Sequence, residues 1–412
     1  MRWFPLLFGL VVLPLSPALA HGQFPLPLGT LLDGARANPV LVNTFGLLIP
    51  VPGQTAFSWV CEEVPGGSMS NAVVWTRTAA GTVLAGSRDG LWRFSSGLCN
   101  ATQVEGIDLS ARIRTLVSHT SLPVVLVGLA DATVRISRDD GRTFAPLLEQ
   151  AGGSAAGFLV EGTDSALEVT VLWRFIGDGT ASFQRWSDAG GAGALVPINA
   201  PLATVWEVVA RDPVRANQVY IRENADGPDR LLRADLTTGE VTQELLTATA
   251  DELVLGISPS GRHVLMGGLT TDMQWSEDSG ATFSPRATLN QLRSVTFVDE
   301  DTIYAAANNW QDRFALGVSD DGAQTWRGLG TFGDIRQVHA CEDEGGARNV
   351  TAACAPYWPA LKELFGIGVD AGVTQPPPDD PAPGPTPGGC PNGSLGMVLL
   401  VLPLRRVLRR HR

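Results

Sequence analysis

Acidic side chains are the residues of this 412-residue chain that could most readily do chemistry. Hydrolysis of a glycosidic bond needs two suitably spaced carboxylates, one acting as acid and the other as base or nucleophile. Four glutamates, Glu161, Glu168, Glu207 and Glu223, fall near the ends of strand-like runs, but nothing singles out a pair among 42 acidic residues. A secreted or surface glycoside hydrolase therefore stays open as an alternative to a protein that only binds its ligand.

Other catalytic motifs are absent from the sequence. The chain has no GxSxG nucleophile elbow, no P-loop and no HExxH helix. His21 would be the first residue after removal of a leader peptide, but copper binding at such a terminus needs a second nearby histidine. We therefore expect no catalytic residue, no metal site and no cofactor.

Three short segments share the pattern Ser-x-Asp-x-x-x-Thr-aromatic. Serine and aspartate side chains can bind nearby backbone amides and hold a tight turn, and glycine supplies a positive φ. The aromatic residue can then pack under the turn, between neighbouring sheets. The residues expected to build these turns are Ser137, Asp139, Gly141, Thr143 and Phe144; Ser276, Asp278, Gly280, Thr282 and Phe283; and Ser319, Asp321, Thr325 and Trp326.

This pattern resembles the Asp-box, or BNR, repeat. The resemblance implies a β-propeller, similar to the seven-bladed propellers of the photosystem II assembly factor and sortilin-like type. Sialidases also carry such boxes, but the Arg-Ile-Pro motif expected near the start of a sialidase is missing from this chain. Degenerate copies of the turn are expected at Arg88–Trp92, Trp186–Asp188 and Asp235–Gly239.

Seven hydrophobic, strand-like runs recur at intervals of 39 to 50 residues, which is the size of a four-stranded blade. The sequence therefore predicts an all-β, seven-bladed β-propeller over residues 21–340. Six blades, eight blades or a pair of β-sandwiches are the alternatives. A strand near Phe24–Leu32 or Asp334–Ala340 is expected to complete the last sheet. The runs are Val40–Phe45, Thr82–Gly86, Val124–Gly128, Glu168–Trp173, Gln218–Arg222, His263–Gly268 and Thr302–Ala307.

Four cysteines are expected to form disulfides, because the chain carries an export signal. They are Cys61, Cys99, Cys341 and Cys354, and three pairings are possible. We favour the sequential pairing, Cys61 with Cys99 and Cys341 with Cys354. A zinc site is the alternative, which the lack of CxxC spacing disfavours.

The segment 341–372 is expected to form a disulfide-closed loop and a short helical cap. Pro359–Phe365 predicts the helix, with proline near its start and Gly366 just past its end. Trp358, Leu361 and Leu364 are expected to lie against the last blade.

Both ends of the chain resemble sorting signals. Residues 1–20 predict a secretory signal peptide cleaved after Ala20. Residues 373–389 are a Pro-rich linker, expected to be disordered. Residues 390–412, with Cys390, an apolar stretch and an arginine cluster, resemble the MYXO-CTERM tails of myxobacterial surface proteins. That resemblance implies processing by a sorting peptidase and attachment at Cys390, so that only the tail meets the membrane. The apolar stretch is shorter than a bilayer span, and a merely disordered tail is the alternative.

The net charge of −12 bears on partners, since an acidic body repels the phosphate backbone of nucleic acids. We expect an exported propeller, held at the cell envelope or outer surface, that binds a protein or polysaccharide without catalysis. Trp310 is expected at an exposed loop tip and is the best single guess for a ligand contact.

Overall fold

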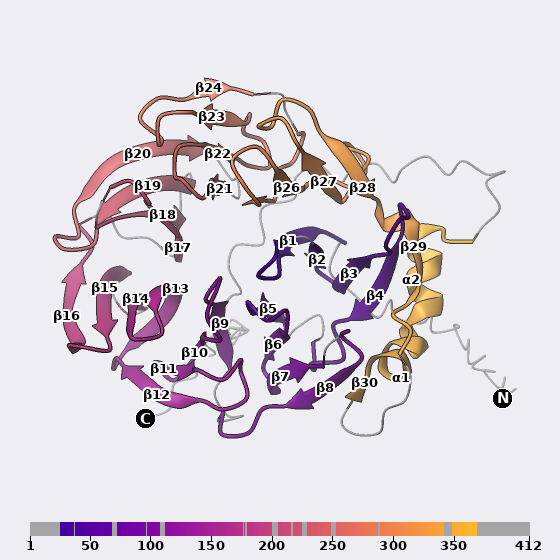
Figure 1. Ribbon diagram of the computed structural model, residues 1–412, viewed down its shortest axis with the longest axis horizontal. Coiled ribbons are helices and arrows are strands. Elements are labelled where there is room, and N and C mark those ends of the chain that lie inside the picture. Colours follow the sequence, from indigo (N-terminus) through magenta and orange to yellow (C-terminus); the bar gives the residue numbers. More distant parts are fainter. Residues whose placement is uncertain are drawn as a thin grey trace, which may run out of the picture.

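Seven antiparallel sheets form a closed ring in the computed structural model (Figure 1). They are numbered here as blades 1 to 7 in chain order. The structure describes residues 25–368 except 37, 68–71, 96, 108–111, 176, 178, 200–204, 216, 225–228, 249–252, 287–288 and 342–347.

Each blade is built from four consecutive strands. The first strands line the central channel: β1 (Pro27–Leu31), β5 (Val74–Arg77), β9 (Ile113–Ser118), β13 (Gly153–Thr163), β17 (Val205–Arg211), β21 (Val254–Ile257) and β25 (Ser294–Phe297). The second strands follow outward: β2 (Val40–Asn43), β6 (Val83–Ser87), β10 (Val125–Leu129), β14 (Ala166–Phe175), β18 (Gln218–Asn224), β22 (Val264–Gly267) and β26 (Ile303–Ala306).

The third and fourth strands complete each blade toward the rim. The third strands are β3 (Gly46–Pro50), β7 (Gly90–Phe94), β11 (Thr133–Ser137), β15 (Thr180–Ser187), β19 (Asp229–Asp235), β23 (Gln274–Ser276) and β27 (Leu316–Ser319). The fourth strands are β4 (Phe57–Cys61), β8 (Asn100–Gln103), β12 (Ala145–Glu149), β16 (Gly191–Pro197), β20 (Val241–Ala248), β24 (Ser284–Pro285) and β28 (Arg327–Gly330).

The seven predicted hydrophobic runs coincide with the seven second strands, so the prediction of seven blades is confirmed. A second strand lies within its sheet and is covered on both faces by neighbouring blades. Every residue of β2, β6, β10 and β22 is accordingly buried. Burial on both faces requires a continuous apolar run rather than alternation, and that is the signal read from the sequence.

The hydrophobic core lies mainly between adjacent blades. Leu84 of blade 2 belongs to the same buried cluster as Val125 of blade 3, and Leu172 of blade 4 to the same cluster as Val219 of blade 5. Around the channel, β25 of blade 7 contacts β1 of blade 1 and closes the circle.

The chain after blade 7 crosses onto the first two blades and is called here the strap (residues 331–368). It contains η1 (Phe332–Asp334), β29 (Ile335–Val338), β30 (Arg348–Asn349), α1 (Val350–Cys354), η2 (Ala355–Tyr357) and α2 (Trp358–Phe365). The strand β29 pairs in parallel with β4, and β30 pairs with β8 (Figure 1).

The expectation that a terminal strand completes the last sheet is wrong. Blade 7 already holds four consecutive strands, β25 to β28. Pro27–Leu31 instead forms the channel strand of blade 1, and Ile335–Val338 adds a fifth strand to the rim of that same blade. The strap thereby covers the exposed edges of blades 1 and 2.

The favoured sequential disulfide pairing is also wrong, although all four cysteines are bonded. Cys61 pairs with Cys354, and Cys99 pairs with Cys341, with Cα–Cα distances of 5.4 and 5.1 Å. Because the strap runs over the rims of both blades, each rim cysteine is bonded to a cysteine of the strap.

The C-terminal helix is confirmed, and it begins one residue before the predicted segment. It ends at Gly366, whose φ of 63° places it in the left-handed region suited to glycine. Trp358 packs on Trp59 of blade 1 with ring centroids 6.3 Å apart, and Leu361 is buried. Trp358 was expected against the last blade and lies instead on blade 1, whereas Leu361 shares a buried cluster with Leu316 of blade 7. Leu364 is 41% exposed, and its expected contact with the last blade stays a prediction.

The predictions for both chain ends fall outside the described residues. These are the signal peptide 1–20 with cleavage after Ala20, the linker 373–389, and the tail 390–412 with Cys390. Among the residues that the structure describes, no helix combines the length and the apolar character needed to cross a membrane.

Candidate binding site at the channel mouth

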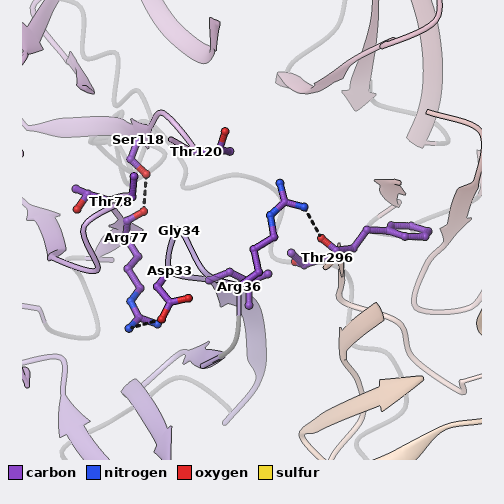
Figure 2. Close-up of a pocket in the computed structure, with 11 residues that line it drawn as sticks. Asp33, Gly34, Arg36, Arg77, Thr78, Ser118, Thr120 and Thr296 are labelled. Atoms are coloured by element: carbon purple, nitrogen blue, oxygen red, sulfur yellow. Dashed lines mark hydrogen bonds and ion pairs between the residues drawn. The ribbon is translucent and has the colours of Figure 1, made fainter. Parts of the chain in front are cut away.

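A cavity of about 220 Å³ with polar and apolar walls, called here the mouth pocket, lies where the channel opens. Its walls come from the loops that follow the first strands of blades 1, 2 and 3, and from the end of β25 in blade 7. Figure 2 shows side chains from these blades facing a common space. Lining residues that could contact a ligand include Asp33, Arg36, Arg77, Ser118, Thr120 and Thr296.

Arg36 crosses the pocket from blade 1 toward blade 7 (Figure 2). Its Nη1 donates to the backbone oxygens of Phe297 at 3.3 Å and Val298 at 3.1 Å. The residue has a φ of 55°, which costs energy for any side chain with a Cβ. Within the described residues, Nε and Nη2 of this guanidinium have no recorded partner, so they can donate to a ligand.

Arg77 lies on the opposite wall and is held in place by its neighbours. Its Nη1 donates to the oxygen of Asn38 at 2.6 Å, and its Nη2 lies 3.5 Å from the Asp33 carboxylate. Burial lowers the pKa of Arg77 from its ordinary value, while the Asp33 charge acts in the opposite direction. Ser118 Oγ donates to the Arg77 backbone oxygen at 2.6 Å, which joins blades 2 and 3 at the mouth.

A long hairpin borders the same end of the channel. The strands β13 and β14 have 11 and 10 residues, more than any other strand, and the exposed residues lie at their turn. Asp164 in that turn interacts electrostatically with His119 of blade 3. Burial lowers the pKa of His119 despite this charge, and its Nδ1 accepts from the backbone nitrogens of Ser121 and Leu122. His119 is therefore a neutral, structural residue at neutral pH.

The four glutamates considered for hydrolysis are each bound to an arginine. Carboxylate–guanidinium distances are 2.7 Å for Glu161–Arg211, 2.9 Å for Glu168–Arg185 and 2.8 Å for Glu207–Arg222, and Glu223 pairs with Arg230. Glu161 and Glu168 stand opposite each other in the β13–β14 register. Each carboxylate is nonetheless bound by its own arginine, Arg211 for Glu161 and Arg185 for Glu168, so the two do not form a free acid–base pair.

The three predicted turns have matching hydrogen bonds, so we call them the repeat turns. In the first, Ser137 Oγ donates to Asp139 Oδ1 at 2.7 Å and accepts from the Gly141 nitrogen at 2.9 Å. Asp139 Oδ1 also accepts from the Thr143 nitrogen at 2.9 Å, and Thr143 Oγ1 donates to Oδ2 at 2.6 Å. The same contacts recur around Asp278 and Asp321.

Each repeat turn joins a third strand to a fourth strand. Burial acts to raise the pKa of Asp139, but its hydrogen bonds to Thr143 and Ser137 hold the pKa at about 2. Hydrogen bonds from Thr325 likewise hold Asp321 at a pKa of about 2, and Thr282 lowers that of Asp278. These ionised aspartates serve the turn itself, and Phe144, Phe283 and Trp326 pack against clusters that combine two blades each.

Two repeat turns also bind the preceding blade through an arginine. Arg93 of blade 2 donates from Nε to the Asp140 oxygen of blade 3 at 3.1 Å. Arg233 of blade 5 donates from Nη2 to the oxygens of Ser279 at 3.2 Å and Gly280 at 3.3 Å in blade 6. Arg233 is buried with Asp212, 3.3 Å away. The turns therefore fasten neighbouring blades together.

Of the degenerate copies, Trp186–Asp188 and Asp235–Gly239 lie after third strands, where a repeat turn belongs. Arg88–Trp92 instead spans the hairpin between β6 and β7, on the opposite face, so its assignment as a copy is wrong. In an antiparallel blade, successive hairpins alternate between the two faces.

Trp310 does not stand at an exposed loop tip, and that expectation is wrong. The ring is partly buried and packs edge-on against Phe332 at 6.0 Å between centroids. A ligand contact by Trp310 stays a prediction.

Sequence reasoning missed Arg36 and Arg77. One signal for Arg36 was present: the loop between the first and second strands of blade 1, Leu32–Pro39, is longer than the matching loops of blades 2 and 3. Arg36 is also the only arginine in these three loops.

Solved structures with a similar fold align with this chain over about three quarters of its length. A structure of U3-55K aligns with a TM-score of 0.52 at 8% identity, covering 74% of this chain and 98% of that one. A Dos1 propeller aligns with a TM-score of 0.48 at 12% identity, over 77% and 96% of the two chains. YCF48 bound to a D1 peptide gives 0.48 at 12% identity, over 73% and 95%.

The likeness is one of fold. No family model matches the chain, and no curated protein matches it. At 8% identity the U3-55K structure shows a likeness of fold alone, and it carries no ligand or activity to this chain.

Proposed function

We propose that this chain is an exported, surface-held Asp-box propeller that binds a protein or polysaccharide at the channel mouth without catalysing a reaction. The mouth pocket is the observation that supports this proposal most directly. It combines a cavity with a guanidinium, Arg36, whose Nε and Nη2 make no hydrogen bond among the described residues. A concave site with a few placed polar groups is typical of ligand recognition.

The chemistry of the pocket favours an anionic group on the ligand, such as a carboxylate. Arg36 can present two nitrogens to it, and Thr120 and Thr296 supply hydroxyls nearby. Such a group occurs both on acidic protein segments and on acidic polysaccharides.

Binding is favoured over hydrolysis because the strand-end glutamates are occupied. Glu161, Glu168 and Glu207 each lie within 3 Å of an arginine nitrogen. A carboxylate that acts on a substrate needs access to it, and each of these carboxylates would first have to leave its guanidinium partner. The aspartates of the repeat turns are likewise committed to local hydrogen bonds.

A paired screen tests the function. Glycan and acidic-peptide arrays would be probed with the exported chain while complex polysaccharides are assayed for hydrolysis. We expect retention of an anionic ligand, at least tenfold weaker in Arg36→Gln, since charged hydrogen bonds are worth about 1.5–3 kcal/mol. Arg262→Gln is the matched control, an exposed arginine in a first-to-second-strand loop away from the pocket. Turnover of any glycosidic bond would overturn the proposal in favour of a glycoside hydrolase.

The location is proposed from the sequence signals at the two ends. Residues 1–20 would direct export, and Cys390 in the MYXO-CTERM-like tail would carry the surface attachment after cleavage by a sorting peptidase. Cys390→Ala should release the protein into the medium. Unchanged retention on cells would refute attachment at that cysteine, and it would leave the binding test unaffected.

A further inference from the structure

Three metal-ligating side chains meet at the junction of the strap with blades 1 and 2. A sulfur of Cys99, a sulfur of Cys341 and a ring nitrogen of His339 all lie within 4.8 Å of one another. The two cysteines form the disulfide that joins blade 2 to the strap. No catalytic or binding role described above uses this cluster.

His339 is fixed by contacts on both sides of its ring. Nδ1 lies 2.9 Å from Ser58 Oγ, and Nε2 lies 2.6 Å from the Gly97 backbone oxygen. A histidine that coordinates a metal through one nitrogen commonly keeps such a hydrogen bond at the other, which orients the ring. Whichever nitrogen turns to a metal, the other retains a partner here.

The strap does not depend on the Cys99–Cys341 bond to stay in place. Its strand β29 pairs with β4, and Cys354 is joined to Cys61 within blade 1. The strap is also held on the blades by β30, which pairs with β8, and by the His339 nitrogen, which donates to the Trp59 oxygen at 2.8 Å. Cys99 and Cys341 would therefore remain neighbours as free thiols.

The two disulfides also differ in accessibility. Cys61 and Cys354 are both fully buried, whereas Cys99 and Cys341 are partly exposed. Thiol–disulfide exchange requires a thiolate to reach one sulfur, so the Cys99–Cys341 bond is the one open to reduction in the folded protein.

We propose that Cys99, Cys341 and His339 form a redox-gated site for a soft metal ion. A dithiol reductant supplies two electrons and two protons to the disulfide, giving two thiols and an oxidised reductant. A Zn²⁺ or Cu⁺ ion then displaces the two thiol protons and binds two thiolates and one imidazole nitrogen. Two sulfurs and one nitrogen suit these ions, and a fourth position stays open for water or an exogenous ligand.

Cobalt(II) provides the test, since thiolate ligation gives a charge-transfer absorption band that oxygen or nitrogen ligands do not. The exported chain would be treated anaerobically with a dithiol, and alkylation with mass mapping would identify the freed cysteines. We expect Cys99 and Cys341 to be labelled first, followed by one Co²⁺ per chain with a thiolate band that Zn²⁺ abolishes.

Two variants separate the site from non-specific thiol binding. His339→Ala should weaken Co²⁺ affinity at least tenfold, and Cys99→Ser/Cys341→Ser should remove the band altogether. Thermal melts of the oxidised proteins check that each variant is folded. The inference is overturned if the Cys99–Cys341 bond resists reduction in the folded chain, if no band appears, or if His339→Ala leaves a folded variant's affinity unchanged.

Discussion

The strap and the repeat turns both fasten neighbouring parts of the ring, but by opposite means. A repeat turn is held by side chains at most a few residues apart, such as Ser137, Asp139 and Thr143. The strap is held by partners far apart in the chain, and its two disulfides close separations of 293 and 242 residues. Local fastening is encoded in a short motif, whereas long-range fastening depends on the finished ring.

Removing the buried disulfide should have the largest effect on stability. Cys61→Ala/Cys354→Ala deletes a crosslink that closes most of the propeller, and chain-entropy arguments give a loss of at most about 5–6 kcal/mol for such a loop. Urea unfolding monitored by tryptophan fluorescence measures it. A loss below about 1 kcal/mol would mean that strand pairing alone holds the strap.

Arg233→Met tests the fastening of a repeat turn to the preceding blade. The substitution removes donors to Ser279 and Gly280 and leaves the Asp212 carboxylate buried with one arginine fewer. We expect a loss of about 3 kcal/mol, since hydrogen bonds to charged groups are worth about 1.5–3 kcal/mol each, although Asp212 keeps Arg215 at 2.9 Å.

Arg93→Met is the matched control for this prediction. Arg93 makes the equivalent bond to blade 3, but its side chain is 24% exposed, so water can replace part of what is lost. We expect about 1 kcal/mol. Equal losses in the two variants would show that burial of the arginine does not matter.

How far the fold could be predicted follows from the same contrast. Continuous apolar runs such as Val124–Gly128 marked the second strands, because burial on both faces leaves a local trace. The disulfide pairing left no such trace: Cys61 meets Cys354 only after seven blades have closed. Local spacing favoured Cys99 as the partner of Cys61, and that inference could not include a strap whose path was unknown.

The candidate site was harder to predict than the fold. Arg36 is a candidate because it lies at the channel mouth, and that position exists only once blades 1 and 7 have met. Its left-handed backbone conformation has no recognisable sequence motif. Trp310 was chosen from a polar local context, but it packs against Phe332 in the strap, a contact between distant segments. Side chains at the ends of the channel strands would have been the better guide.

Gly141→Ala separates packing from backbone strain in a repeat turn. Gly141 has a φ of 77°, and an added Cβ would come within 2.6 Å of a methyl of the fully buried Leu84 in blade 2. Gly152→Ala is the control, with a φ of 75° and nothing within 4 Å. We expect about 1 kcal/mol for the control and about 1–3 kcal/mol more for Gly141→Ala, measured by urea unfolding. Equal costs would mean that blade 2 yields to the new methyl group.

Acid should weaken the repeat turns but not the strap, and this is the smallest expected effect. Asp139 has a pKa of about 2 in the folded chain against 3.8 ordinarily, a lowering due to its hydrogen bonds. A lowered folded pKa adds stability that is fully present above about pH 4 and is lost as the pH falls toward 2. Asp139→Asn should therefore melt below the parent at pH 5, with a difference that shrinks by pH 2. Because Asp139 is partly exposed and water screens its charge, a shift of a few degrees is expected. The Cys61→Ala/Cys354→Ala variant is the control. Its melting temperature should stay below that of the parent by a constant amount from pH 5 to pH 2, since no titrating group is removed. A constant difference for Asp139→Asn as well would contradict the assignment of the turn's stability to the ionised aspartate.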